Sequence, residues 1–214
     1  VYKRQIFTSG GSESDNMAIT GIAKKRGKGH IITSKIEHHA VLHTVQALEK
    51  EGFEATYLDV DSDGIISLDE LRAAIREDTV LITIMYANNE IGSVQPIKEI
   101  GAIAGEHKIP FHTDAVQAAG HLKIDVRSEN IDMLSLSAHK FGGPKGTGVL
   151  YVKRGVNPKN LILGGGQERG KRAGTENIAG IIGTAEALSL ALSRIDEVTP
   201  VSYTHLRAHE TGAY

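Results

Sequence analysis

The sequence predicts an α/β fold in which helices flank a mainly parallel β-sheet on both faces. Apolar runs of strand length alternate with helical patterns along most of the 214-residue chain, an order that is typical of parallel sheets. Residues 80–85 form a continuous apolar run, as expected of a strand buried on both faces. The 24 glycines exceed the usual share of ~7% and gather in short clusters after expected strands. No repeat or low-complexity linker interrupts this order, which indicates one domain.

The first half of the chain predicts two strands and two helices. In order, these are a strand at 6–8, a helix through 17–22, a strand at 30–33 and a helix over 41–52. In the second helix, Val41, Leu42, Val45 and Leu48 share one face, which we expect to pack on the sheet. The helix ends at Gly52, because glycine readily terminates helices.

The second half continues the alternation. The expected strands lie at 54–58, 80–85, 109–112, 131–136 and 149–152, and the expected helices at 68–76, 96–103 and 175–195. Ser67 and Glu70 form a capping box that opens the first of these helices, and Pro96 suits the start of the second. The stretch 178–195 is the longest apolar run, but it contains Thr184 and Glu186. We therefore interpret it as a packed helix rather than a membrane span.

The two ends of the chain do not fit the pattern. Residues 1–5 and 199–214 lack the aliphatic periodicity of the rest. We expect the domain to span residues 6–198 and both ends to be non-native or disordered, with a native flexible terminus as the alternative.

Composition excludes several classes of function. The formal charge is −2, there is no tryptophan, and aromatic residues make up 5% of the chain, which argues against nucleic acid or an anionic membrane as the main partner. The absence of cysteine excludes disulfides, cysteine-based metal sites and a cysteine nucleophile within these residues. No basic and then apolar leader is visible, so we expect a cytoplasmic location.

Two segments that follow expected strands suit a ligand with a phosphate and a ring nitrogen. Ser9 to Ser14 leads directly into a helix, whose free N–H groups and dipole favour a phosphate. The alternative is an ordinary glycine-rich turn with Ser12 as the N-cap. Asp114, with Gln117 three residues later, could hold a ring nitrogen protonated. A capped helix start also explains this pair.

Two further segments could complete such a site at the carboxyl ends of the strands. Lys140 stands at a strand end before Phe-Gly-Gly-Pro, where desolvation could remove its proton and let it attack a carbonyl group. Most lysines, however, are only solvated surface charges. Residues 164–175 form a cationic, glycine-rich loop before the longest helix, and this loop could offer donors to an anion.

Taken together, six motifs closely resemble the cysteine desulfurases, a class V branch of the aspartate-aminotransferase-like (fold type I) pyridoxal-phosphate enzymes. The motifs are FTSGGSESDN at 7–16, TSKIEH at 33–38, NNEIG at 88–92, HTDAVQ at 112–117, SAHKFGGPKG at 137–146 and GGGQERGKRAGT at 164–175. They run in the family's order and cover nearly all of the chain between residues 6 and 198. The resemblance implies the large domain of that fold, without the N-terminal segment and the small C-terminal domain.

The resemblance also implies roles around the ring of pyridoxal 5'-phosphate. Lys140 would bind the cofactor covalently and then move protons, with His38 stacked on the ring as the second catalytic group. Asp114 would pair with the ring nitrogen, and Gln117 would contact the ring hydroxyl oxygen. Asn89 would contact the ring and the substrate side.

For the phosphate, the resemblance implies a second group of residues. The backbone amides of Gly11 and Ser12, the hydroxyls of Ser12 and Ser137, and His139 would hold it. Thr175 matches the residue that reaches the phosphate of a neighbouring subunit, which implies a homodimer.

The family reaction takes sulfur from L-cysteine, leaves alanine and passes a persulfide to a sulfur-acceptor protein for iron–sulfur cluster or thionucleoside synthesis. The family's persulfide-forming cysteine lies in the small domain, and this chain has no cysteine. We therefore expect the chain to bind the cofactor but not to desulfurate cysteine. The alternatives are a selenocysteine lyase, which uses the same lysine pocket, and a non-catalytic fragment.

Three other patterns suggest rival sites. Residues 59–70 match the text of an EF-hand calcium loop, but an expected strand precedes them where an EF-hand needs a helix. His39 and His43 lie one helical turn apart without a visible third metal ligand. Residues 143–148 fit no nucleotide-binding spacing. We therefore expect no metal site.

Overall fold

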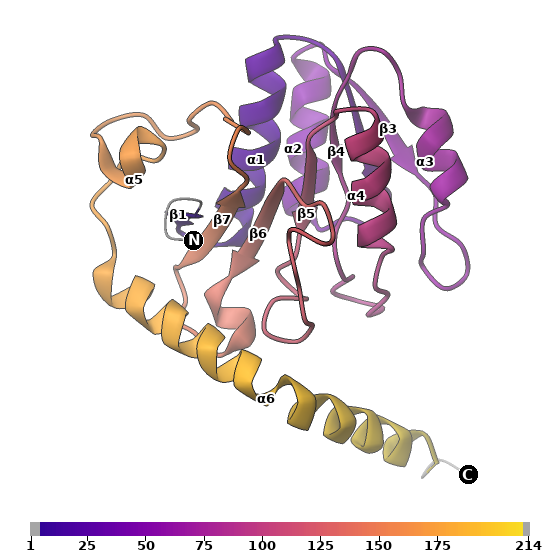
Figure 1. Ribbon diagram of the computed structural model, residues 1–214, viewed down its shortest axis with the longest axis vertical. Coiled ribbons are helices and arrows are strands. Elements are labelled where there is room, and N and C mark those ends of the chain that lie inside the picture. The colour runs from indigo at the N-terminus through magenta and orange to yellow at the C-terminus, as the bar shows by residue number, and fades with distance from the viewer. Residues whose placement is uncertain (1–4, 212–214) are drawn as a thin grey trace.

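The computed structural model describes residues 5–211, and side-chain burial for residues 5–197, as an α/β unit built on a seven-stranded sheet (Figure 1). The strand order is β1-β7-β6-β5-β4-β2-β3. β7 runs antiparallel to its neighbours β1 and β6, and the other strand pairs are parallel. The strands are β1 Gln5–Thr8, β2 His30–Ser34, β3 Glu54–Leu58, β4 Thr79–Thr83, β5 Phe111–Asp114, β6 Met133–Ser137 and β7 Gly148–Val152. The predicted fold class is confirmed.

Helices cover both faces of the sheet, as predicted (Figure 1). They are α1 Gly11–Arg26, α2 His39–Lys50, α3 Leu68–Ala74, α4 Ile97–Glu106, the 3₁₀ helix η1 Ala138–Phe141, α5 Gln167–Gly170 and α6 Ile178–Thr211. Ile31 and Ile32 of β2 show how the two cores divide, because successive side chains of a strand point to opposite faces. Ile31 packs with residues of α1 and α2, and Ile32 with residues of α3 and α4.

Some helices and strands begin or end at other residues than predicted, because backbone hydrogen bonding rather than apolar sequence sets their ends. The apolar run 80–85 is longer than β4, although its last part still pairs through the N–H of Ile84, which donates to His112 O at 3.2 Å. β5 begins at Phe111 rather than at residue 109. Pro96 is the N-cap of α4 instead of its first helical residue. The capping box is confirmed in part, since the Glu70 N–H donates to Ser67 Oγ at 3.3 Å.

α6 is the longest helix, as predicted, but the expectation that it is a packed helix is wrong for most of its surface. One stripe with Ala187, Leu188 and Ala191 packs against η1, whereas Ile178 and Ile182 are 67% and 64% exposed. Within the described part of the chain, α6 is the one helix that is long and apolar enough to cross a membrane, over Ile178–Glu197. Of the most apolar part of this segment, 17% is buried. α6 carries apolar residues on more than one face, and a single neighbouring element cannot bury all of those faces.

The structure describes part of each end that does not fit the sequence pattern. Gln5 belongs to β1, where it pairs with Tyr151, and the backbone of residues 199–211 continues α6. Residues 1–4 and 212–214 lie outside the described residues. That the two ends are non-native or disordered stays a prediction.

Candidate functional site

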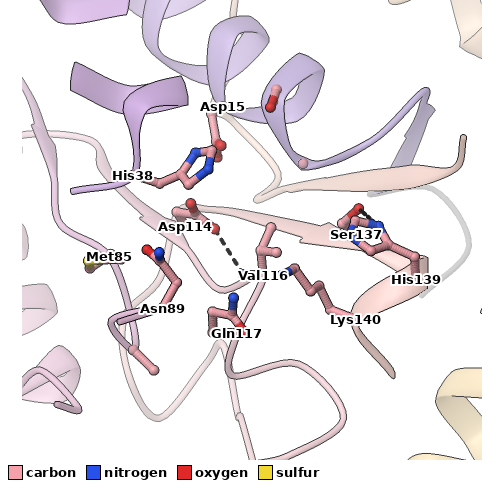
Figure 2. Close-up of a pocket in the computed structure, with 13 residues that line it drawn as sticks. Asp15, His38, Met85, Asn89, Asp114, Val116, Gln117, Ser137, His139 and Lys140 are labelled. Carbon is pink, nitrogen blue, oxygen red and sulfur yellow. Dashed lines mark hydrogen bonds between the residues drawn. The ribbon is translucent and has the colours of Figure 1, made fainter. Parts of the chain in front are cut away.

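A cavity of about 280 Å³ lies where β1, β5 and β6 end, between the N-terminus of α1 and η1 (Figure 2). Nine of the ten predicted cofactor-binding residues line it: Gly11, Ser12, His38, Asn89, Asp114, Gln117, Ser137, His139 and Lys140. These residues come from five separate stretches of sequence, so the fold brings them together. Asp15, Met85, Ala87 and Val116 also line the cavity, and the sequence analysis did not assign them to the site.

The loop between β1 and α1 forms one end of the cavity. Gly10 is the N-cap of α1 and makes no side-chain cap bond, and Ser12 lies inside the helix. The alternative in which Ser12 is the N-cap is therefore wrong. The first turn of a helix leaves N–H groups without intrahelical acceptors, and here that turn borders the cavity. A side chain at Gly11 would place its Cβ 2.6 Å from Val116 Cγ2, which explains why the smallest residue stands there.

Ser137 and the short helix η1 form the neighbouring wall. Ser137 Oγ and His139 Nδ1 are 2.9 Å apart and share a hydrogen bond (Figure 2). Figure 2 shows the amine end of Lys140 directed toward the side of the cavity that holds Asp114 and Val116. The Lys140 side chain is exposed, so the described residues do not provide the desolvation that the sequence suggested. The position expected for Lys140 is found, but not its expected burial.

Asp114 ends β5 and is 5% exposed. Its Oδ1 accepts the Val116 N–H at 2.9 Å. Burial raises the pKa of Asp114 above its ordinary value, although this hydrogen bond and the electrostatic effects of His38 and Lys140 oppose the rise. The carboxyl group of Asp114 therefore shares the cavity with two basic side chains, His38 and Lys140. Basic neighbours favour the ionised form of a carboxyl group.

His38 and Asn89 are placed by local backbone geometry. His38 is the N-cap of α2, and its Nδ1 accepts the Ala40 N–H at 3.0 Å. Nδ1 is thus an acceptor, which leaves Nε2 as the ring nitrogen that can donate a hydrogen bond. The side chain of Asn88 fixes the turn that presents Asn89: its Oδ1 accepts the N–H groups of Glu90 and Ile91 at 2.8 and 3.0 Å. Asn89 itself lines the cavity.

Thr175 is the one predicted site residue that does not line the cavity. It is exposed and lies before α6. The loop at 164–175 is nevertheless fixed to the cavity's helix, because Arg172 Nε and Nη2 donate to Glu13 of α1 at 2.8 and 3.1 Å. The role of Thr175 toward a neighbouring subunit stays a prediction.

The rival calcium loop is a turn followed by a capped helix. β3 precedes it, as expected. Asp61 Oδ1 accepts the N–H groups of Asp63 and Ile65, both at 2.9 Å, and Asp59 pairs with Lys35 at 2.5 Å. The carboxylate of Asp61 therefore stabilises the turn, and that of Asp59 forms a surface ion pair.

The rings of His39 and His43 are neighbours, with centroids 4.9 Å apart. Among the side chains that the structure describes, residues 5–197, however, no three histidine, aspartate or glutamate side chains are grouped so that they could hold a metal ion.

Comparison with known proteins agrees with this arrangement. Residues 2–209 match the model of the aminotransferase class-V family. The cysteine desulfurase IscS of Clostridium botulinum is 62% identical, over a region that covers 90% of this chain and 49% of that protein. The cysteine desulfurase IscS of Methanosarcina thermophila is 58% identical, over 96% of this chain and 55% of that protein. The chain thus spans about half the length of the curated relatives it matches.

Solved structures give the same result for the fold. A NifS-like protein that is 42% identical superposes with a TM-score of 0.90, over 92% of this chain and 55% of that one. SspA, solved in complex with cysteine, is 52% identical and superposes with a TM-score of 0.86, over 88% of this chain and 56% of that one. The chain belongs to the aminotransferase class-V family, and it is similar there to cysteine desulfurases.

Proposed function

We propose that the cavity holds pyridoxal phosphate and that the chain is the cofactor-binding part of a cysteine desulfurase. The observation that supports this most strongly is that Lys140, Asp114 and the N-terminus of α1 meet around one cavity of about 280 Å³. The cofactor offers an aldehyde, a basic ring nitrogen and a phosphate ester. An amine, a carboxylate and a helix N-terminus are the complementary protein groups.

The described residues fit this cofactor. The N-terminal turn of α1, with Gly11 and Ser12, would bind the phosphate together with Ser137 and His139. Gly11 is packed so closely against Val116 that the backbone itself must form this part of the cavity. On the other side, Asp114 would hold the ring nitrogen.

Bound pyridoxal phosphate supplies an electron sink for negative charge that develops on an amino-acid substrate. Lys140 contributes an amine that acts as a nucleophile and then as a proton carrier at Nζ. Asp114 holds a proton at the ring nitrogen through its negative charge. His38 keeps Nε2 available for proton exchange, because Nδ1 already accepts the Ala40 N–H. Gln117 and Asn89 contribute polar groups at the cavity wall.

The proposed substrate is L-cysteine, with alanine as the product and a sulfur-acceptor protein as a partner. This part rests on similarity to relatives named cysteine desulfurase and to SspA, which was solved in complex with cysteine. Persulfide formation requires a cysteine, and these 214 residues contain none. We expect the chain to bind the cofactor without desulfurating cysteine, and Thr175 to serve the neighbouring cofactor of a homodimer.

An absorbance titration with pyridoxal phosphate tests the proposal. The chain should develop a saturable visible band that differs from the spectrum of the free cofactor, because the amine of Lys140 binds its aldehyde. Lys140→Ala should lose the band completely. Lys145→Ala is the matched control, since Lys145 lies five residues away and does not line the cavity, and it should keep the band. A band of equal strength in Lys140→Ala would refute the proposed site.

A further inference from the structure

Two buried carboxyl groups share the wall of the cavity. Asp15 of α1 and Asp114 at the end of β5 both line it, and they are 1% and 5% exposed. Removing a carboxylate from water is costly unless hydrogen bonds or opposite charges compensate. Two neighbouring buried carboxylates cost more still, because each negative charge opposes the other. The surroundings therefore decide which of the two groups carries a charge.

The surroundings of Asp114 favour a negative charge more than those of Asp15 do. A backbone N–H donates to its Oδ1 at 2.9 Å. Burial raises the pKa of Asp114 above its ordinary value, but the electrostatic effects of His38 and Lys140 oppose the rise. Hydrogen bonds and cations of this kind stabilise the ionised form of a carboxyl group.

The surroundings of Asp15 favour the neutral acid. Its Oδ1 has no hydrogen-bond partner within the described residues. This oxygen lies 3.7 Å from a basic group, His112 Nε2. His112 is fully buried, and its ring nitrogens already contact Thr83 Oγ1 at 2.8 Å and Ser135 Oγ at 3.0 Å. Burial lowers the pKa of His112 to about 3, so the ring is neutral near pH 7 and offers Asp15 no positive charge.

The other charged groups near Asp15 act in the same direction. Burial raises the pKa of Asp15 most, followed by the negative charge of Asp114, and Glu37 adds to the effect. The hydroxyl of Ser135 opposes it. On α1 itself, the nearby Glu13 is paired with Arg172. His38 and Lys140 line the same cavity, where they lower the pKa of Asp114.

We propose that Asp15 is a positioning residue of this site that remains a neutral carboxylic acid and thereby keeps the single negative charge of the cavity wall on Asp114. If the proposed function holds, that charge is then available to the ring nitrogen of pyridoxal phosphate. The unpartnered oxygen of Asp15 also gives the cavity a neutral hydrogen-bonding group beside the charged carboxylate of Asp114.

Infrared spectroscopy of the full chain without cofactor tests the charge assignment. A protonated carboxyl group has a C=O stretching band that a carboxylate lacks. At neutral pH, Asp15→Asn should remove one component of that band, and Glu37→Gln assigns the component of the other buried acid. Asp132→Asn is the matched control. Asp132 is paired with Lys153 at 2.8 Å just before β6, at the opposite end of the sheet, and its replacement should leave the band unchanged.

A second variant tests the coupling without altering Asp15. Asp114→Asn removes the charge that opposes ionisation of Asp15, so the pH at which the Asp15 component disappears should fall by roughly one unit or more. If Asp15→Asn leaves the protonated band intact, or if Asp114→Asn leaves the Asp15 midpoint in place, the assignment is overturned. Because neither arm uses cofactor, failure here differs from failure to bind pyridoxal phosphate.

In a separate titration, Asp15→Asn should keep the visible band with unchanged affinity, since asparagine mimics the neutral acid, and a lost band would contradict the proposal.

Discussion

Replacing Glu37 with glutamine should flatten the pH dependence of the chain's stability. Burial raises the pKa of Glu37 to about 8, although Ser34 Oγ and the Met85 N–H donate to its Oε1. Above a pH of about 4.5 the unfolded chain releases this proton while the folded chain keeps it, so stability falls as the pH rises toward 8. Between about pH 5 and pH 8, the native chain should lose roughly 3–5 kcal/mol that the variant retains.

Urea unfolding at a series of pH values measures this difference. The free energy of unfolding of Glu37→Gln, relative to the native chain, should increase steadily with pH and level off above the raised pKa. Glu99→Gln removes an exposed acid of α4 and should preserve the native slope. Equal slopes in the native chain and in Glu37→Gln would show that Glu37 is ionised in the folded state.

Replacing Phe111 with alanine should cost about 3–5 kcal/mol of the free energy of unfolding. Phe111 begins β5 and is completely buried in the core between the sheet and the helices α3 and α4. Alanine would remove most of the ring's apolar contacts and leave a cavity that this core cannot refill. Since β5 also carries Asp114, binding of pyridoxal phosphate should weaken in parallel as the folded fraction falls.

Thermal and urea unfolding of Phe111→Ala and Phe111→Leu provide the measurement and its control. Leucine retains more of the buried volume, so its cost should be clearly smaller. A cost near zero in both variants would mean that the side chain at position 111 contributes little beyond a small apolar group.

The sequence predicted the sheet and most of the candidate site because both depend on local signals. Strands buried on both faces appear as continuous apolar runs, and the residues expected to bind the cofactor follow those strands directly. Asp15 was missed because it lies inside a helix, where its chemistry is not marked by a glycine cluster or a strand end. It stands four residues after Gly11, and this spacing on one helix face was the available signal.

Features that depend on neighbouring elements could not be predicted from the sequence. The apolar residues of α6 suggested burial, but the pattern does not show which element would cover Ile178 and Ile182, and both are exposed. The position of Lys140 at a strand end was correct. Its exposure depends on how η1 and α6 pack, and no local signal reports that packing.

Chemical trapping of the cofactor tests the central claim most directly. The chain is mixed with pyridoxal phosphate, reduced with borohydride and digested, and the labelled peptide is identified by mass spectrometry. A single phosphopyridoxyl group is expected on Lys140, because that amine lies in the cavity with Asp114 and the N-terminus of α1. Label distributed over exposed lysines such as Lys24 and Lys145, with none enriched at Lys140, would contradict it.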